Sequence, residues 1–130
     1  VGGVTLTARI TPGHTKGCTT WTLAVDADGR RHDVVIIGGT TVLPGDRLLG
    51  NPKYPEMAAD YARTFEILRS LPCDVPLGAH AGYYGMIEKY NRLKGGARPN
   101  PFIDPRGYRA FIDASERDFR RELARERKLH

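Results

Sequence analysis

Two histidines stand in glycine-rich turns, where loops commonly present the side chains of a site. His14 lies within Thr-Pro-Gly-His-Thr-Lys-Gly at residues 11–17, and His80 precedes Ala-Gly-Tyr-Tyr-Gly at residues 81–85. Each turn follows a segment with the pattern of a β-strand, and glycine lets the backbone bend sharply there. Neutral imidazole is a common zinc ligand, so both histidines are candidate metal ligands. Spacing alone leaves open the alternative that each has a purely structural role.

The other histidines and the cysteines are weaker candidates. His32 lies beside two arginines in a predicted hairpin and His130 is the last residue, so both are expected to be exposed and uninvolved. Cys18 follows His14 by four residues, but in a strand the two side chains need not face each other, which disfavours a Cys–His hydrolase. Cys73 is expected to pack at a turn, and nothing in the sequence says whether the two cysteines pair.

Composition excludes several classes of protein. The length of 130 residues suits one domain, and 40% hydrophobic with 27% charged residues is unlike a disordered or membrane-spanning chain. No apolar run approaches the roughly 20 residues that cross a bilayer. The net charge is +5. Basic and acidic residues alternate over residues 114–130, as on a solvated helix face, so a nucleic-acid partner is not expected.

The first part of the chain has the pattern of strands. Residues 4–10 and 19–25 alternate and are rich in β-branched side chains. Residues 26–29 supply turn chemistry, and the return strand at 32–37 has an unbroken apolar run that predicts burial on both faces. A loop rich in glycine and proline follows, at residues 38–55.

From Glu56 onward the hydrophobic period becomes helical, and this helix is predicted to end near residues 71–72. Its apolar stripe consists of Met57, Tyr61, Phe65 (or Thr64) and Leu68. A short strand at 74–78 contains a proline that favours a sheet edge or a strand start, and a short helix covers 86–93. The last helix begins after Asp104, with proline at its first position. This order predicts an α/β or α+β arrangement with helices packed on a sheet.

The segment from residue 10 to 21, Ile-Thr-Pro-Gly-His-Thr-Lys-Gly-Cys-Thr-Thr-Trp, closely resembles the T-P-G-H-T-x-G-x-T-x-W segment of metallo-β-lactamases of the third subclass. Further segments match this family in the same order: 51–55, 60–61, 70–75, 77–86, and 100–105 with Tyr108. The resemblance covers nearly the whole chain. The sequence is therefore similar to the C-terminal half of a metallo-β-lactamase.

This resemblance implies a fold and a metal site. The family has an αββα sandwich with a dinuclear zinc site between two sheets, so residues 1–130 are expected to form one unit. That unit would be the C-terminal half, a mixed sheet with helices packed on one face, and the N-terminal half would be absent. His14 would complete the first zinc site and His80 would join the second. No residue of this chain is assigned a catalytic acid or base role.

The resemblance also suggests substrate contacts. The loop after the 32–37 strand lacks the cysteine ligand of the first two subclasses, which supports the third. Thr40 and Thr41 stand where that subclass often has serines near the β-lactam carboxylate, although capping of the loop is an equally good role for them. Tyr83 would line the mouth of the site, with aromatic packing as the alternative.

The activity implied by the resemblance is zinc-dependent opening of the β-lactam ring by a metal-bound hydroxide, an antibiotic-resistance function. The family is usually exported, so a periplasmic or secreted location is expected. Its H-x-H-x-D-H motif, which supplies two ligands to each zinc, does not occur in this sequence. With only His14 or His80 on each ion, the chain alone is expected to be inactive, because catalytic zinc takes three protein ligands.

The expected partners are the N-terminal half of the same protein or a second copy, and a β-lactam substrate. Two alternatives stay open. A metallo-β-lactamase fold can also hydrolyse another ester, a lactone or a thioester. Alternatively, the chain is a non-catalytic half-domain that self-associates through an exposed sheet.

Overall fold

The computed structural model describes residues 2–129, and its elements follow the predicted order of strands, helix, strand and two helices. They are β1 (Thr7–Ile10), β2 (Thr19–Ala27), β3 (Arg30–Ile37), α1 (Met57–Ser70), β4 (Val75–Gly78), the 3₁₀ turn η1 (Ala81–Tyr83), α2 (Met86–Lys94) and α3 (Pro105–Lys128). The sequence did not predict η1, and β1 is three residues shorter at its start than the predicted strand.

The four strands form one mixed sheet in the order β1-β2-β3-β4, which confirms the predicted fold class. β2 is antiparallel to both β1 and β3, whereas β3 and β4 are parallel. Asp28 and Gly29 both have positive φ, 52° and 72°, which matches a hairpin turn whose twist suits the flanking strands. Pro76 lies in β4 at the sheet edge, where its missing N–H costs no ladder hydrogen bond, as predicted.

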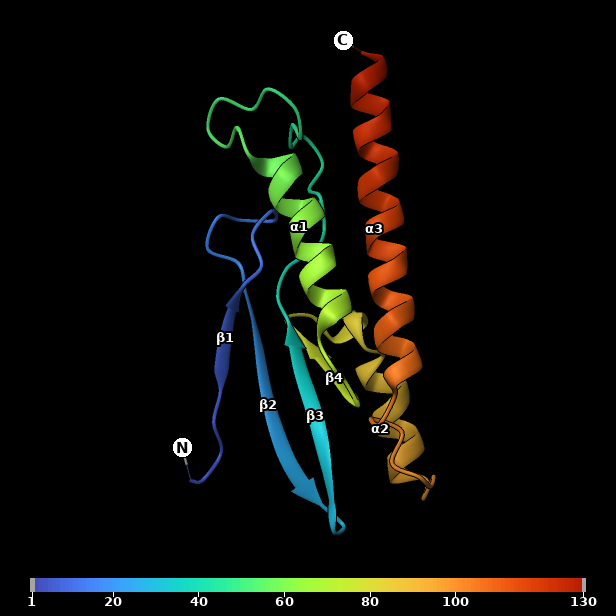
Figure 1. Cartoon of the computed structure of the whole chain (residues 1–130). Helices are drawn as coiled ribbons and strands as arrows, with labels where there is room; N and C mark the ends of the chain where they lie inside the picture. Colours follow the sequence, from blue (N-terminus) through green and yellow to red (C-terminus); the bar gives the residue numbers. More distant parts are fainter. Residues whose placement is uncertain (1, 130) are drawn as a thin grey trace.

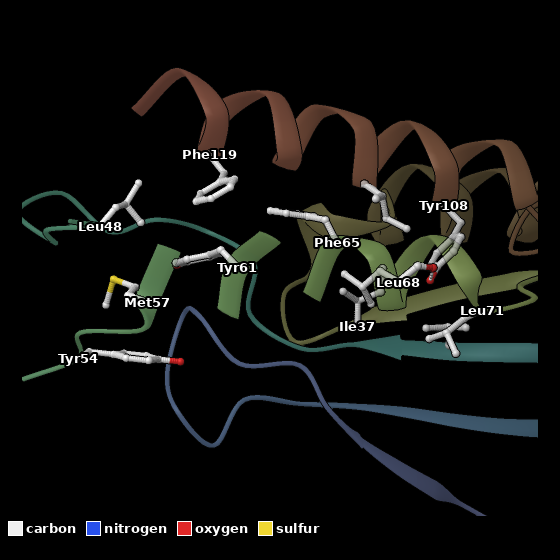
Figure 2. Packing of buried hydrophobic residues seen from close by; sticks show 12 residues of the cluster. Ile37, Leu48, Tyr54, Met57, Tyr61, Phe65, Leu68, Leu71, Tyr108 and Phe119 are labelled. Atoms are coloured by element: carbon white, nitrogen blue, oxygen red, sulfur yellow. Dashed lines mark hydrogen bonds between the residues drawn. The ribbon is translucent and has the colours of Figure 1, made fainter. Parts of the chain in front are cut away.

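Helices α1 and α3 run side by side in opposite directions on one side of the sheet (Figure 1). The predicted stripe of α1 is buried in full, and it forms the core with residues of α3, β3 and the loop before α1. Aromatic rings fill the centre of this core (Figure 2): the centroid of Phe119 lies 5.3 Å from that of Tyr61 and 5.8 Å from that of Phe65. Helix α3 packs on this core through its buried residues Tyr108, Ile112 and Phe119.

The opposite side of the sheet is only partly covered. Val35 and Ile37 of β3 point into the core, so Ile36 and its partner Trp21 on β2 point the other way. Trp21 is 41% exposed and Ile10 of β1 is 59% exposed. We call this side, which also carries Leu23 and Leu77, the outer sheet face. The prediction of burial on both faces holds for the apolar run of β3, where Val34, Val35 and Ile37 are buried and Ile36 is half-buried, but not for the start of the strand, which is exposed.

Helix α3 is anchored at both ends. The Asp104 carboxylate accepts a hydrogen bond from the Gly107 N–H at 2.9 Å, which confirms the predicted helix start. Near the other end, the buried Glu126 carboxylate accepts from the N–H groups of Leu48 and Leu49, both at 2.9 Å. The irregular segment between β3 and α1 is therefore tied to α3. Among residues 2–129, no helix is long and apolar enough to cross a membrane.

Candidate metal centre

The imidazole of His14 lies directly against the backbone of Gly39. A Cβ atom added at Gly39 would be 2.4 Å from Cδ2 and 2.7 Å from Cγ of His14. Real Cβ atoms do not approach that closely, so the contact requires a glycine at this position. Gly39 comes two residues after the end of β3, and the contact therefore fixes His14 at that end of the strand.

A hydrogen bond sets the tautomer of His14. Its Nδ1 lies 2.6 Å from the carbonyl oxygen of Thr41. A carbonyl oxygen only accepts hydrogen bonds, so Nδ1 carries a proton, and in the neutral imidazole Nε2 then has the free lone pair. Metal-binding histidines typically donate their second ring N–H to a carbonyl or carboxylate, which orients the ring. The arrangement of His14 is of this kind.

The turn that carries His14 is held by elements on two sides. The hydroxyl of Thr64 on α1 donates to the carbonyl of Pro12 at 2.6 Å. The hydroxyls of Thr11 and Thr20 lie 2.9 Å apart in a buried hydrogen bond. These contacts join the turn to α1 and to β2, so the backbone before His14 is firmly positioned.

His80 lies at the same edge of the sheet. In the parallel register of β3 and β4, Ile37 is the partner of Gly78. His80 follows Gly78 by two residues, just as Gly39 follows Ile37 by two. Neighbouring strands are about 4.8 Å apart, and the carboxyl ends of parallel strands meet at one edge. This register places His80 at the same end of the sheet as Gly39, which contacts His14. The side chain of His80 is exposed.

Tyr83 packs between His80 and α3. Its ring centroid lies 5.2 Å from that of His80 in an edge-to-face arrangement, and 4.6 Å from that of Phe111. A Cβ at Gly78 would come within 2.8 Å of the Tyr83 ring. The half-buried Tyr83 thus has the packing role that the sequence left as an alternative. Its proposed place at the mouth of the site stays a prediction.

The two threonines of the loop after β3 differ in orientation. Thr40 is 3% exposed and its hydroxyl donates to Ser115 of α3 at 3.4 Å, which favours the structural alternative for this residue. Thr41 is exposed, and its carbonyl accepts hydrogen bonds from His14 and from the hydroxyl of Tyr61, the latter at 2.8 Å. Substrate contact by either threonine stays a prediction.

Sequence reasoning missed the part played by Gly38 and Gly39. A Cβ at Gly38 would lie 2.8 Å from the sulfur of Cys18, and the Cys18 thiol donates to the Gly39 carbonyl at 3.3 Å. Both glycines therefore permit close approach of the turn that holds His14. The adjacent pair of glycines was the only signal in the sequence, and it did not say what approaches them.

The remaining histidines and cysteines lie elsewhere. His32 is half-buried, so the expectation that it is exposed was wrong: the segment after α2, with Arg98 and Ile103, folds back over the hairpin and shares a cavity with it. His130 lies outside the described residues. Both thiols are free, and burial raises the pKa of the Cys73 thiol to about 12. A thiol with so high a pKa is a poor nucleophile, consistent with a packing role.

Within residues 2–129, no group of three or more His, Cys, Asp or Glu side chains is arranged to hold a metal ion. The described part of the chain thus contributes single imidazoles at this sheet edge. A catalytic zinc ion takes three protein ligands and an open position, which His14 or His80 alone does not provide.

No protein-family model matches the chain. Among solved structures, the native FEZ-1 metallo-β-lactamase from Legionella gormanii is 43% identical over 98% of this chain and 48% of its own, with a TM-score of 0.95. BJP-1, a subclass B3 metallo-β-lactamase of Bradyrhizobium japonicum, is 37% identical over 99% of this chain and 48% of its own, with a TM-score of 0.89.

LRA-12, a class B3 di-zinc metallo-β-lactamase from an Alaskan soil metagenome, is 26% identical over 93% of this chain and 46% of its own, with a TM-score of 0.82. The chain thus spans about half the length of these proteins. The resemblance predicted from the sequence is confirmed: the solved structures that this chain matches are metallo-β-lactamases, members of the third subclass, B3, among them, and the match extends over about half of their length.

Proposed function

We propose that this chain supplies half of a zinc-dependent β-lactamase, and that His14 and His80 each bind one of two zinc ions. The observation that carries the proposal is the hydrogen bond that orients the His14 imidazole. Its Nδ1–H donates to the Thr41 carbonyl, so Nε2 is free to bind a metal at the sheet edge where His80 also lies.

The donor set fits zinc. Imidazole nitrogen is one of the ligands that zinc prefers, and neither imidazole is fully buried: His14 is half-buried and His80 is exposed. When bound, zinc lowers the pKa of a water molecule to about 7 and offers positive charge to a developing oxyanion. The task of His14 and His80 is to hold the metals, and neither side chain needs to accept a proton from substrate.

The remaining ligands would come from the N-terminal half of the same protein, where the family has its H-x-H-x-D-H motif. Residues 1–130 would then be a single C-terminal unit. Two findings support this: the chain spans about half of its relatives, and Ile10 and Trp21 leave the outer sheet face partly uncovered. Covering these side chains would remove apolar surface from water.

A β-lactam would bind at this edge, with Thr40, Thr41 and Tyr83 as candidate contacts. Family resemblance further supports a periplasmic location for the intact protein, which cell fractionation tests. The fold does not by itself fix the bond that is cleaved.

The test is hydrolysis of a chromogenic cephalosporin by the intact protein, followed by removal of zinc with a chelator and its return. We expect activity to be lost and restored, and to fall at least about 100-fold in His14→Ala and His80→Ala. His32→Ala is the matched control, because His32 lies on the hairpin away from this edge, and it should retain activity. Zinc-dependent thioester cleavage without lactam turnover would contradict the substrate class, and unchanged turnover in both variants would contradict the site.

A further inference from the structure

We propose that Tyr61 is a positioning residue for His14, acting through the backbone carbonyl of Thr41. The zinc-related part of this proposal rests on the proposed function, whereas the effect of Tyr61 on the imidazole does not.

One carbonyl oxygen joins the two side chains. The Tyr61 hydroxyl donates to the Thr41 oxygen at 2.8 Å, and His14 Nδ1 donates to the same oxygen at 2.6 Å. A carbonyl oxygen has two lone pairs, so these two donors occupy both. The position of the Thr41 oxygen, and with it the direction in which His14 Nδ1–H points, is therefore linked to helix α1.

Tyr61 is well suited to fix that oxygen, because its own ring is immobilised. The side chain is 1% exposed and stacks on Phe65 and Phe119, and Figure 2 shows the Tyr61 ring below that of Phe119. On its other side, a Cβ at Gly13 would lie 2.7 Å from Cγ of Tyr61, so the residue before His14 packs directly on this ring. Burial raises the pKa of Tyr61 above its ordinary value, and the hydroxyl accordingly stays a donor.

Thr41 lies in the irregular segment between β3 and α1 and is exposed. The neighbouring Thr40 side chain contacts Ser115 at 3.4 Å, at the long end of hydrogen-bond distances. Without the Tyr61 hydroxyl, the Thr41 peptide would be freer to rotate, and the imidazole would lose the fixed acceptor that selects its Nδ1–H tautomer. A metal ligand whose orientation is not fixed in advance binds more weakly.

The experiment compares Tyr61→Phe with Tyr108→Phe in the intact protein. Tyr108 is a matched control: it is 5% exposed, belongs to the same core, and its hydroxyl donates to the Leu68 carbonyl at 2.6 Å. Each variant removes one buried tyrosine hydroxyl that bonds to a backbone carbonyl, but only Tyr61 reaches the acceptor of His14. Two quantities are measured: zinc affinity by chelator competition, and the nitrogen-15 spectrum of the His14 imidazole in zinc-free protein.

We expect both variants to lose similar stability, since the lost bonds are alike. Tyr61→Phe should weaken binding of the zinc ion that His14 holds about 10-fold and shift the His14 proton toward a mixture of the two tautomers, while Tyr108→Phe should do neither. A Tyr61→Phe protein that matches Tyr108→Phe in both zinc affinity and imidazole spectrum would overturn the proposal.

Failure of the proposed function gives a different result. If His14→Ala binds two zinc ions as tightly as wild type, His14 is not a ligand, yet the zinc-free spectrum still reports whether Tyr61 sets its tautomer. The wild-type spectrum is a second check that needs no variant to fold. A His14 proton found on Nε2 in the zinc-free wild-type protein would overturn the proposal directly.

Discussion

Gly39 and His14 are in contact at a distance that only a glycine allows: a Cβ on Gly39 would lie 2.4 Å from Cδ2 of the imidazole. The two residues are 25 positions apart, on the loop after β3 and the turn before β2. Their contact joins the turn to the sheet edge, and because Nδ1 of His14 donates to the Thr41 carbonyl, Nε2 is the ring atom that can bind a metal. The position of His14 in the proposed site thus depends on the absence of a side chain at Gly39.

Gly39→Ala should therefore damage the site more than the fold. The added methyl group must displace the His14 ring, which we expect to weaken zinc binding at least about 10-fold, with a loss of about 1–3 kcal/mol in the free energy of unfolding. Zinc titration and urea denaturation of the intact protein measure the two effects. Gly17→Ala is the control in the same turn, because nothing lies within 4 Å of a Cβ there. Equal zinc affinity in the two variants would show that the Gly39 contact does not position His14.

The ion pairs between α1 and α3 predict a dependence of stability on pH. The hydrogen bond from Arg69 lowers the pKa of Glu116, outweighing its partial desolvation, and Arg120 adds to the effect. Asp113 is the second acid paired with Arg69. A carboxyl group whose pKa is lowered by folding stabilises the fold above its unfolded-state pKa, and this stabilisation is lost as pH falls through the folded-state pKa.

Glu116→Gln should therefore be less stable than wild type at pH 7, by less than about 1 kcal/mol because the pair is partly solvated. The difference should shrink toward zero as pH falls below about 4.5. Urea denaturation across this pH range measures it. Asp118→Asn is the control, since Asp118 and its partner Arg121 are both highly exposed and 3.5 Å apart. A difference that stays constant from pH 7 to pH 3 would contradict the assigned role of Glu116.

The outer sheet face can be followed with Trp21, which is the single tryptophan of the sequence. Because Trp21 is 41% exposed, its fluorescence in this chain should be quenched readily by acrylamide. If the N-terminal half of the protein covers this face, adding that half should shift the emission to shorter wavelength and reduce the quenching. Sedimentation of the chain alone is the control for self-association. Emission and quenching that stay unchanged on addition of the other half would contradict the proposed partner surface.

The sequence predicted elements whose signals are local. The α1 stripe through Tyr61 and Leu68 follows from helical periodicity, and the start of α3 follows from Asp104 and the proline after it. Family resemblance supplied His14 and His80, which spacing alone did not distinguish from structural histidines. These features could be predicted because each one is encoded within a few neighbouring residues or a contiguous motif.

The features that sequence analysis missed depend on residues far apart in the chain. His32 lines a cavity together with a segment more than 60 positions later, and Gly39 contacts a ring 25 positions earlier. The loop that carries Thr40 and Thr41 has no periodicity, so nothing in it indicates that one side chain points inward and the next outward. The packing of α1 and α3 against this loop determines which of the two threonine side chains points inward.

In the proposed site, His14 and His80 bind two different zinc ions. The most direct measurement is the zinc content of the intact protein and its variants by native mass spectrometry. We predict two ions in wild type and in His32→Ala, and one ion in each of His14→Ala and His80→Ala. Two ions retained in both of the last two variants would contradict the claim.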